Sequence, residues 1–414
     1  MKKQSIASVK EDLFKDKRVL VRVDFNVPQS KTDGSITDDS RIRAAIPTIE
    51  RLVANGAKVI LVSHLGRPDG KKVEKLTLKP VATRLQELLK EKSDVKVDFI
   101  DETVGPEVEK KVDGMKSGEI LLLENVRFHA GEEKNDPEFV KQLAKLADVY
   151  VNDAFGTAHR AHASTEGVAH LVRPALAGML MDKELKMLGA ALDDPARPVA
   201  CIIGGSKVSS KIGVLDNLIQ KVDIIIIGGA MAFTFLKAQG KNVGKSLVED
   251  DRMEYCRELE KKAKDKGVRI ILPEDVVCAA EMKEGVESKT VDADNIPAEQ
   301  MGLDIGPKSI ATVKEALEPC KTILWNGPPG VFEIPGFDKG TNELIEQLIT
   351  LTRKGAKTII GGGDSVAALQ KKNVPGDALT HISTGGGASL EFLEGIELPG
   401  VACLDEAETA AKAK

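Results

Sequence analysis

IRAAIPTIERLVANGAKVILVSHLGR, residues 42–67, contains in one stretch the pattern that decides the fold. Over 42–56, apolar residues recur every three or four positions and a glycine closes the segment, which is typical of an amphipathic helix with its C-terminal cap. KVILVS (58–63) is apolar almost throughout, as expected of a strand that is covered on both faces. The polar loop HLGR (64–67) follows directly. The stretch therefore predicts a helix packed on a buried parallel strand.

The same alternation runs along the whole chain. Ten further short runs rich in Val, Ile and Leu occur at 19–23, 95–100, 120–124, 148–152, 199–203, 223–228, 268–272, 322–325, 357–361 and 379–383. Helical patterns lie between them. Strand and helix in regular alternation predict an α/β protein in which helices cover both faces of parallel sheets, a doubly wound, Rossmann-like arrangement in three layers.

Length and strand number both indicate two domains. A chain of 414 residues exceeds one ordinary core, and eleven strands exceed what one open sheet usually holds. The segment PALAGMLMDKELKMLGAALDDPARP (174–198) carries a long helical pattern and ends in a proline-containing turn. We predict a first domain over 1–173, a helical hinge over 174–197 and a second domain over 198–400. The short tail, 401–414, is expected to pack back on the first domain.

The composition limits the partners and the compartment. A net charge of −5 argues against nucleic acid or an anionic membrane as the main partner. The five cysteines are odd in number and form no metal-binding pattern, which suits reduced thiols. The N-terminal residues MKKQSIASVK are not followed by an apolar segment, and no apolar run approaches the ~18 residues of a membrane span. We therefore expect a soluble, cytoplasmic protein.

Arginines and histidines follow the strands of the first half. Ten of the fifteen arginines precede residue 174. Arg67, Arg127 and Arg160 each come a few residues after a different strand, so the fold would gather them at one edge of the sheet. The planar guanidinium suits phosphate or carboxylate. The first half therefore predicts an anion site. Asp24 and Asn26 of VDFNVP either add groups for a hydroxyl or form a turn before Pro28, and the residues alone favour neither alternative.

Glycine-rich turns follow the strands of the second half. GGSK (204–207), NGPPGVFE (326–333) and GGGDS (361–365) would let the backbone and helix N-termini approach phosphates. Lys207 and Lys211 lie one helical turn apart in this interpretation. Asp364 is the natural candidate for a hard cation. GKNVGKS (240–246) is one residue short of a P-loop and follows a helical segment, so we interpret it as a structural turn.

The cluster AFGTAHRAHAS (154–164) leaves three alternatives open at first. His159 and His162 could ligate a metal, the two histidines with Arg160 could hold an anion, or the loop could be a solvated turn. No Cys, Asp or Glu lies at a spacing that completes a transition-metal site nearby, and Arg160 would repel a cation. The anion site is favoured.

Eight motifs occur in the order and spacing typical of one family. They are RVDFNVP, SHLGRP, LLENVRFH, NDAFGTAHRAHAS, GGSKVSSKI, WNGPPGVFE, GGGDS and STGGGASLEFLEG. From about Lys17 to Gly400 the chain resembles phosphoglycerate kinase. The resemblance implies reversible transfer of the acyl phosphate of 1,3-bisphosphoglycerate to ADP, which gives 3-phosphoglycerate and ATP.

In the first domain the resemblance implies that Arg67, Arg127 and Arg160 hold the 3-phosphate together with His64. Arg41 would lie near the reacting carboxyl phosphate. His159 and His162 would shape the positive potential, and substituting both is expected to raise KM more than it lowers kcat. The full set of implied substrate-binding residues is Asp24, Phe25, Asn26, Arg41, His64, Leu65, Gly66, Arg67, Arg127, His159, Arg160 and His162.

In the second domain the resemblance implies that Lys207 and Lys211 bind the nucleotide phosphates, Glu333 the ribose and Gly302 the adenine. Mg2+ carried by the nucleotide would bind Asp364. The full set of implied nucleotide-binding residues is Gly205, Lys207, Lys211, Gly302, Asn326, Glu333, Gly362, Gly363, Asp364 and Ser365. The residues around the moving phosphoryl group, which are the implied catalytic ones, are Arg41, Lys207, Gly363 and Gly386.

Phosphoryl transfer of this kind needs positioning and charge stabilisation more than a general base. Because the two substrates are expected on different domains, the domains would close to bring them together. The family expectation for the oligomeric state is a monomer.

A nicotinamide dehydrogenase is one alternative function, but the motif GxGxxG follows no strand. A non-catalytic anion-binding protein would not need the nucleotide-type turns. A metallohydrolase using His159 and His162 lacks ligands.

Overall fold

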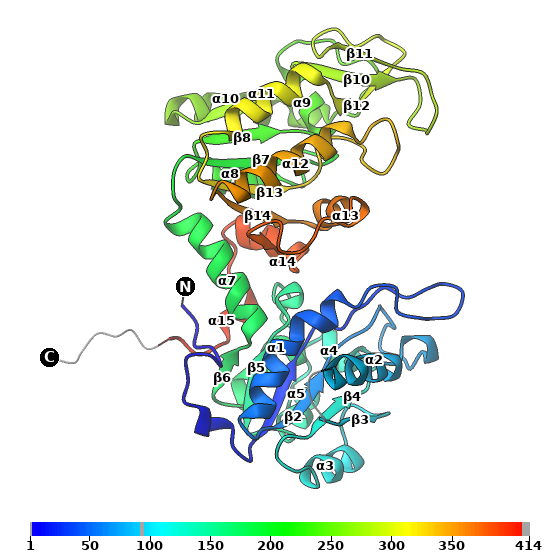
Figure 1. Ribbon diagram of the computed structural model, residues 1–414, viewed down its shortest axis with the longest axis vertical. Coiled ribbons are helices and arrows are strands. Elements are labelled where there is room, and N and C mark those ends of the chain that lie inside the picture. The colour runs from blue at the N-terminus through cyan, green and yellow to red at the C-terminus, as the bar shows by residue number, and fades with distance from the viewer. Residues whose placement is uncertain (1, 92–94, 408–414) are drawn as a thin grey trace, which may run out of the picture. The chain divides into compact units, whose positions relative to one another are not determined.

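In the computed structural model, residues 2–91 and 95–407 are described. The chain divides into two compact units, Met1–Lys186 with the segment from Glu397 onward, and Met187–Ile396. Each unit contains its own six-stranded sheet with helices packed on it (Figure 1). The boundary lies inside helix α7 (Met179–Asp193), within the segment expected to be the hinge. Residues 408–414 of the expected tail lie outside the described part.

The first unit is built on a parallel sheet in the order β3-β4-β2-β1-β5-β6. Its strands are β1 (Arg18–Arg22), β2 (Lys58–Val62), β3 (Val97–Ile100), β4 (Ile120–Leu123), β5 (Val149–Asn152) and β6 (Ala175–Ala177). Its α-helices are α1 (Ser40–Ala54), α2 (Lys79–Lys90), α3 (Pro106–Asp113), α4 (Ala130–Glu133), α5 (Pro137–Ala144), α6 (Val168–Leu171), the first part of α7, and α15 (Pro399–Ala402). The predicted parallel α/β arrangement is confirmed here.

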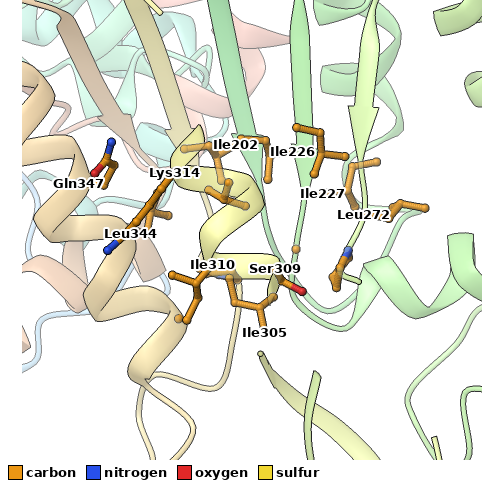
Figure 2. Close-up of a pocket in the computed structure, with 16 residues that line it drawn as sticks. Ile202, Ile226, Ile227, Leu272, Ile305, Ser309, Ile310, Lys314, Leu344 and Gln347 are labelled. Atoms are coloured by element: carbon orange, nitrogen blue, oxygen red, sulfur yellow. The ribbon is translucent and has the colours of Figure 1, made fainter. Parts of the chain in front are cut away.

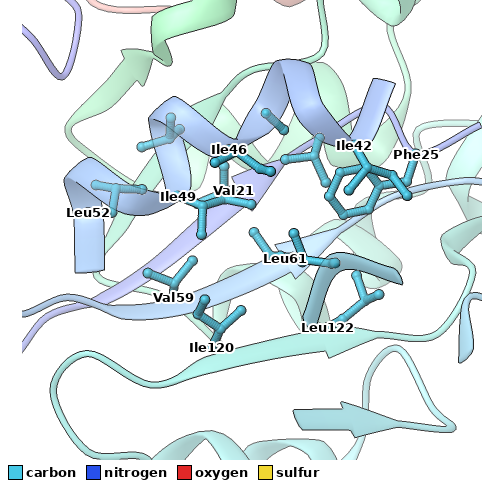
Figure 3. Packing of buried hydrophobic residues seen from close by; sticks show 14 of the residues in the cluster. Val21, Phe25, Ile42, Ile46, Ile49, Leu52, Val59, Leu61, Ile120 and Leu122 are labelled. Atoms are coloured by element: carbon cyan, nitrogen blue, oxygen red, sulfur yellow. The ribbon is translucent and has the colours of Figure 1, made fainter. Parts of the chain in front are cut away.

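Helix α1 carries the apolar face that the opening stretch predicts. Ile42, Ile46 and Ile49 are at most 7% exposed and pack on the buried side chains of β1, β2 and β4 (Figure 3). The helix continues through Pro47, which lacks an N–H group and costs about 3 kcal/mol inside a helix. Each fully buried isoleucine stabilises the fold by about 1.5–3 kcal/mol, so the packing outweighs the proline.

The segment after Arg173 begins with a strand and not with a helix. Ala175–Ala177 pairs in parallel with β5, and α7 starts only at Met179. Oδ1 of Asp153 accepts hydrogen bonds from the N–H groups of Leu180 (2.9 Å) and Met181 (3.2 Å), which defines the start of the helix. The prediction of one continuous helical pattern from Pro174 was therefore wrong for its first residues.

The second unit is built on a parallel sheet in the order β15-β14-β13-β7-β8-β9. Its strands are β7 (Val199–Ile203), β8 (Ile224–Ile227), β9 (Arg269–Ile271), β13 (Thr322–Asn326), β14 (Lys357–Gly361) and β15 (His381–Ile382). Its α-helices are the rest of α7, α8 (Ile212–Leu218), α9 (Met231–Ala238), α10 (Met253–Lys266), α11 (Pro307–Leu317), α12 (Lys339–Arg353), α13 (Gly363–Lys371) and α14 (Gly387–Leu393).

A small antiparallel sheet in the second unit was not predicted. It has the order β11-β10-β12 and is formed by β10 (Asp275–Ala279), β11 (Ser288–Asp292) and β12 (Met301–Ile305). Four residues of β11 are exposed, so SKTVD gives no apolar run from which a strand could be recognised. The expectation of parallel sheets alone was wrong at this place.

Candidate functional site

The predicted anion residues of the first unit surround one pocket. It has a volume of about 250 Å³ and lies beyond the carboxyl ends of β1, β2, β4 and β5. Between β1 and β5 the order of the strands reverses along the chain, which is where open α/β sheets bind ligands. The lining residues are Asp24, Asn26, Arg41, His64, Gly66, Arg67, Arg127, Gly156, Thr157, His159 and Arg160.

Hydrogen bonds between loops hold the pocket in shape. Nη1 of Arg127 donates to the carbonyl of Gly66 (3.0 Å), and the N–H of Gly66 donates to Oδ1 of Asn26 (2.9 Å). The loops after β1, β2 and β4 are thus joined to each other. Arg67 and Arg160 are exposed, and within the described residues Arg67 has no carboxylate at ion-pair distance. Its guanidinium is therefore available to an anion.

Arg41 reaches the pocket from the first turn of α1 and forms an ion pair with Asp24. The Arg41 side chain is 36% exposed, whereas the Asp24 side chain is 10% exposed. The pair connects the first helix to the loop after β1. A ligand carboxylate or phosphate could share the guanidinium, which has five N–H donors.

Arg22 is a residue of this site that the sequence analysis missed. It is fully buried at the end of β1, where Nε donates to Oγ of Ser164 (2.8 Å) and Nη2 lies 3.2 Å from Nδ1 of His64. Because a guanidinium can only donate, Nδ1 of His64 must accept and the ring proton sits on Nε2. An arginine among the apolar residues of VLVRV was the signal that could have identified it.

His64 and His162 are neutral at neutral pH. Burial, with the charge of Arg22 second, lowers the pKa of His64 well below its usual range. Burial and the charge of Arg127 lower the pKa of His162 to about 4. His162 does not line the pocket and lies 4.0 Å from the buried carboxylate of Glu132. The expectation that His162 adds positive potential was therefore wrong.

Two further implied substrate residues do not line the pocket with their side chains. Phe25 is fully buried in the core of the first unit, and its N–H donates to Oγ of Ser63 (2.8 Å). Leu65 is 2% exposed. Their chain neighbours line the pocket, so the backbone of Phe25 and Leu65 passes beside it. Their side chains point into the core because they are apolar.

The second unit contains a larger pocket of about 530 Å³. Four of the implied nucleotide residues line it, namely Gly205, Gly302, Glu333 and Asp364. The pocket also has an apolar side, which the sequence did not indicate and which is formed by Ala230, Phe233, Leu247, Val276, Met282, Met301, Leu303 and Val331. An apolar cleft with a few polar groups at one end is typical of a site for a nucleotide or a molecule of similar size.

Glycines allow the loops at this pocket to touch. The N–H of Gly204 donates to the carbonyl of Asn326 (2.9 Å), and a Cβ at Gly204 would lie 2.1 Å from the carbonyl oxygen of Pro328. A Cβ at Gly302 would lie 2.2 Å from the ring of Phe233. The loops after β7 and β13 therefore meet where the strand order of the second sheet reverses.

Lys211 and Asn326 lie next to this pocket but do not line it. Nζ of Lys211 donates to Oδ1 of Asn326 (2.8 Å), and burial lowers the pKa of Lys211. Lys207 is exposed and lies before the helix, because α8 begins only at Ile212. The expected spacing of Lys207 and Lys211 by one helical turn was therefore wrong.

Helix α13 begins at the pocket with GGGDS. Gly362 is its N-cap, with φ of 87°, and Gly363 and Asp364 form its first turn. Ser365 is buried and its Oγ accepts a hydrogen bond from the N–H of Gly327 (2.6 Å), so it fixes the NGPPG turn. Gly386 is the N-cap of α14, with φ of 51°. Backbone N–H groups at the start of α13 are available to an anion.

A narrow cavity of this unit, about 20 Å³, lies between the sheet and helices α11 and α12 (Figure 2). Its walls are mostly aliphatic, including Ile202, Ile226 and Ile310. Nζ of Lys314 at its rim is paired with Oε2 of Glu343 (2.6 Å). The cavity thus offers no free charge to a phosphate, and we do not regard it as the nucleotide site.

The structure also bears on a metal cluster, on the P-loop-like segment GKNVGKS and on a membrane span. Among residues 2–91 and 95–407, no group of three or more His, Cys, Asp or Glu side chains could hold a metal ion. GKNVGKS follows α9 and forms turns and an isolated bridge, as predicted for a turn and not for a P-loop, and its Lys245 lines the larger pocket of this unit. None of the helices in the described ranges has the length and apolar character required to cross a membrane.

An anion pocket with four arginines on one doubly wound unit and a nucleotide-type pocket on another define a two-unit α/β phosphotransferase. The family model "Phosphoglycerate kinase" matches residues 9–396. Phosphoglycerate kinases of Acaryochloris marina (strain MBIC 11017) and Gloeothece citriformis (strain PCC 7424) are 57% and 58% identical to the chain, covering 98% of it and 100% of their own lengths. The chain belongs to the phosphoglycerate kinase family.

Solved structures of the family have the same fold. Phosphoglycerate kinase from Coxiella burnetii has a TM-score of 0.87 at 41% identity, and that from Pyrococcus horikoshii OT3 has a TM-score of 0.79 at 32% identity. Both alignments cover 97% of this chain and 98% of the other.

Proposed function

We propose that this chain catalyses reversible, Mg2+-dependent phosphoryl transfer between 1,3-bisphosphoglycerate and ADP, with 3-phosphoglycerate and ATP as the products. One observation carries the proposal: the family's anion-binding arginines and its nucleotide-type turns each surround a pocket at the reversal point of a separate sheet. The phosphoryl acceptor is a carboxylate or an ADP oxygen, both of which are nucleophiles without a general base.

In the first unit, Arg67, Arg127 and Arg160 hold the 3-phosphate. Neutral His64 donates through Nε2, since Arg22 occupies Nδ1. Charge-assisted hydrogen bonds from guanidinium groups to phosphate contribute roughly 1.5–3 kcal/mol each. Asp24 and Asn26 bind the hydroxyl, and Arg41 stabilises charge on the transferring phosphoryl group. Because this anchoring involves the end of the substrate that does not react, it supplies binding energy for orientation.

In the second unit, the apolar side of the pocket around Gly302 takes the adenine and Glu333 takes the ribose. Lys207, Lys211 and the first N–H groups of α13 neutralise the phosphates. Mg2+ enters with the nucleotide and is part of that substrate. A single carboxylate, Asp364, fits this cation, because Mg2+ usually binds through one or two carboxylates together with phosphates and waters.

The proposal also covers the compartment and the oligomeric state of the protein. We infer that it acts in the cytoplasm as a monomer. All five cysteines are free and buried, which suits a reducing compartment. Light scattering after size-exclusion chromatography tests the monomer, and a dimer mass would contradict it.

A coupled assay of ATP formation from 1,3-bisphosphoglycerate and ADP tests the function. We expect turnover by the wild type and a loss of at least about 100-fold in kcat for Arg41→Ala, because a donor aimed at charge in the transition state is worth 10²–10³ in rate. Wild-type activity no greater than that of Arg41→Ala would refute the proposal.

A further inference from the structure

The side-chain amide of Asn125 forms hydrogen bonds to the backbone of two loops of the anion site. The residue follows β4 and is fully buried. Oδ1 accepts from the N–H groups of Arg127 (3.1 Å) and Leu65 (3.3 Å). Nδ2 donates to the carbonyls of Leu65 (2.7 Å) and Leu76 (2.9 Å). An amide offers two donor hydrogens and two acceptor lone pairs, so every position is taken.

The partners permit only one orientation of this amide. The Leu65 backbone meets it twice, with its N–H on Oδ1 and its carbonyl on Nδ2. Turning the amide over would place NH2 against N–H and oxygen against carbonyl. Burial makes such unpaired polar groups costly. The amide therefore holds the Leu65 backbone in both position and direction.

The two loops that Asn125 joins carry phosphate-binding groups. Leu65 stands between His64 and Gly66, and Gly66 also accepts from Nη1 of Arg127. Asn125 is the N-cap of the short 3₁₀-helix Val126–Phe128, which contains Arg127. A shift of the Leu65 backbone would thus change the distance between His64 and the Arg127 guanidinium.

We propose that Asn125 is a positioning residue of the anion site, whose amide sets the spacing of the loops that carry His64 and Arg127. The inference rests on the function proposed above, because it concerns binding of the substrate's phosphate. Asn125 does not line the pocket, and it acts through the groups that do.

Two substitutions separate this role from simple capping. Asn125→Ser keeps an oxygen that can cap the Arg127 N–H but is too short to reach Leu65 and Leu76, whereas Asn125→Ala removes both functions. We expect both variants to raise KM for 3-phosphoglycerate about tenfold or more. KM for ATP should stay within about twofold of the wild type, because only the binding site of the first unit is changed. A wild-type KM for Asn125→Ser would overturn the proposal.

Gln86 offers a matched control in the same unit. Its side-chain amide also bridges backbone groups, donating to the Val95 carbonyl (2.9 Å) and accepting from the Val97 N–H (2.8 Å), but it is not among the residues that line the pocket. We expect Gln86→Ala to leave both KM values unchanged. An equal rise of KM for 3-phosphoglycerate in Gln86→Ala would show a general effect of destabilisation and overturn the proposal.

Two measurements keep the test independent of folding and of turnover. If neither Asn125 variant folds, the side-chain NH2 resonance of Asn125 in the wild type decides. A shift on saturation with 3-phosphoglycerate supports the proposal and an unchanged resonance contradicts it. If the wild type binds 3-phosphoglycerate but does not turn over, the proposed function fails, while calorimetric titration of the variants with 3-phosphoglycerate still measures the effect of Asn125.

Discussion

At the scale of single residues, the anion site depends on which cations are charged. Arg67 and Arg160 are exposed guanidinium groups, whereas burial beside Arg22 and Arg127 keeps His64 and His162 neutral. A neutral imidazole can still donate one hydrogen bond but adds no long-range attraction. Arg67 and Arg160 therefore add positive potential that His64 and His162 do not.

Arg160 and His162 should accordingly respond differently to substitution. We expect Arg160→Gln to raise KM for 3-phosphoglycerate about 10–100-fold, through loss of a charge-assisted hydrogen bond of roughly 1.5–3 kcal/mol. His162→Gln should change KM less than about threefold, because no charge is lost at pH 7. Steady-state kinetics at two ionic strengths measure both. A weaker salt dependence for His162→Gln than for Arg160→Gln would contradict the assignment of charges.

At the scale of elements, the start of α7 is capped by the carboxyl group of Asp153, whose pKa is raised by burial. Asp153 is fully buried, Oδ1 caps the helix, and Oδ2 has no hydrogen-bond partner within the described residues. Burial raises the pKa of Asp153 from 3.8 to about 7. Protonation of Oδ2 removes the buried charge and leaves the cap on Oδ1 in place.

Stability should depend on pH through Asp153. Since its pKa is higher in the folded than in the unfolded state, proton binding stabilises the fold fully below about pH 4, and this contribution is lost as the pH rises to about 7. Asp153→Asn keeps the capping oxygen and cannot ionise. Relative to this variant, the wild type should lose roughly 2–4 kcal/mol of unfolding free energy between pH 4 and pH 8.

Urea unfolding followed by circular dichroism at several pH values measures this difference. Asp136→Asn is the matched control, because it also changes a carboxylate that caps a helix. Oδ1 of Asp136 accepts hydrogen bonds from the N–H groups of Glu138 and Phe139 at the start of α5. A constant difference between the wild type and Asp153→Asn across the range would show that Asp153 does not titrate as expected.

At the scale of the whole molecule, the segments around Gln4 and Asp405 lie side by side in the first unit. The N–H of Gln4 donates to the carbonyl of Asp405 (2.8 Å), and Arg173 forms an ion pair with Asp405. The N–H of Gly400 donates to the carbonyl of Ala158 (2.8 Å), in the loop that carries Arg160. The second unit is thus inserted between segments of the first, so the chain crosses between units twice.

Closure of the two units should accompany catalysis. In the proposed function each unit binds one substrate, and reacting atoms must come within about 3–3.5 Å for transfer. We expect small-angle scattering to show a smaller radius of gyration with 3-phosphoglycerate and ATP together than with either alone. An unchanged radius under saturating, turnover-competent conditions would contradict hinge closure.

The sequence by itself determined the pattern of helices and strands and the identity of the polar loops. Burial on both faces makes parallel strands such as KVILVS apolar almost throughout, and HLGR comes directly after such a strand, so local patterns reveal both. Strands β6, β10, β11 and β12 were not predicted. β11 is exposed and β6 has only three residues, so neither has a recognisable apolar period. The spacing of Lys207 and Lys211 was misjudged because the start of α8 depends on its surroundings.

Only the tertiary structure decided the states and roles of the side chains. Burial of Arg22 against His64 fixes the proton on Nε2, desolvation neutralises His162, and the contacts of Asn125 join loops that are sixty residues apart in sequence. These properties depend on distance and on the exclusion of water, which arise when separate segments of the chain pack together. A one-dimensional pattern contains the residues but not their neighbours, and the electrostatics of a site is set by its neighbours.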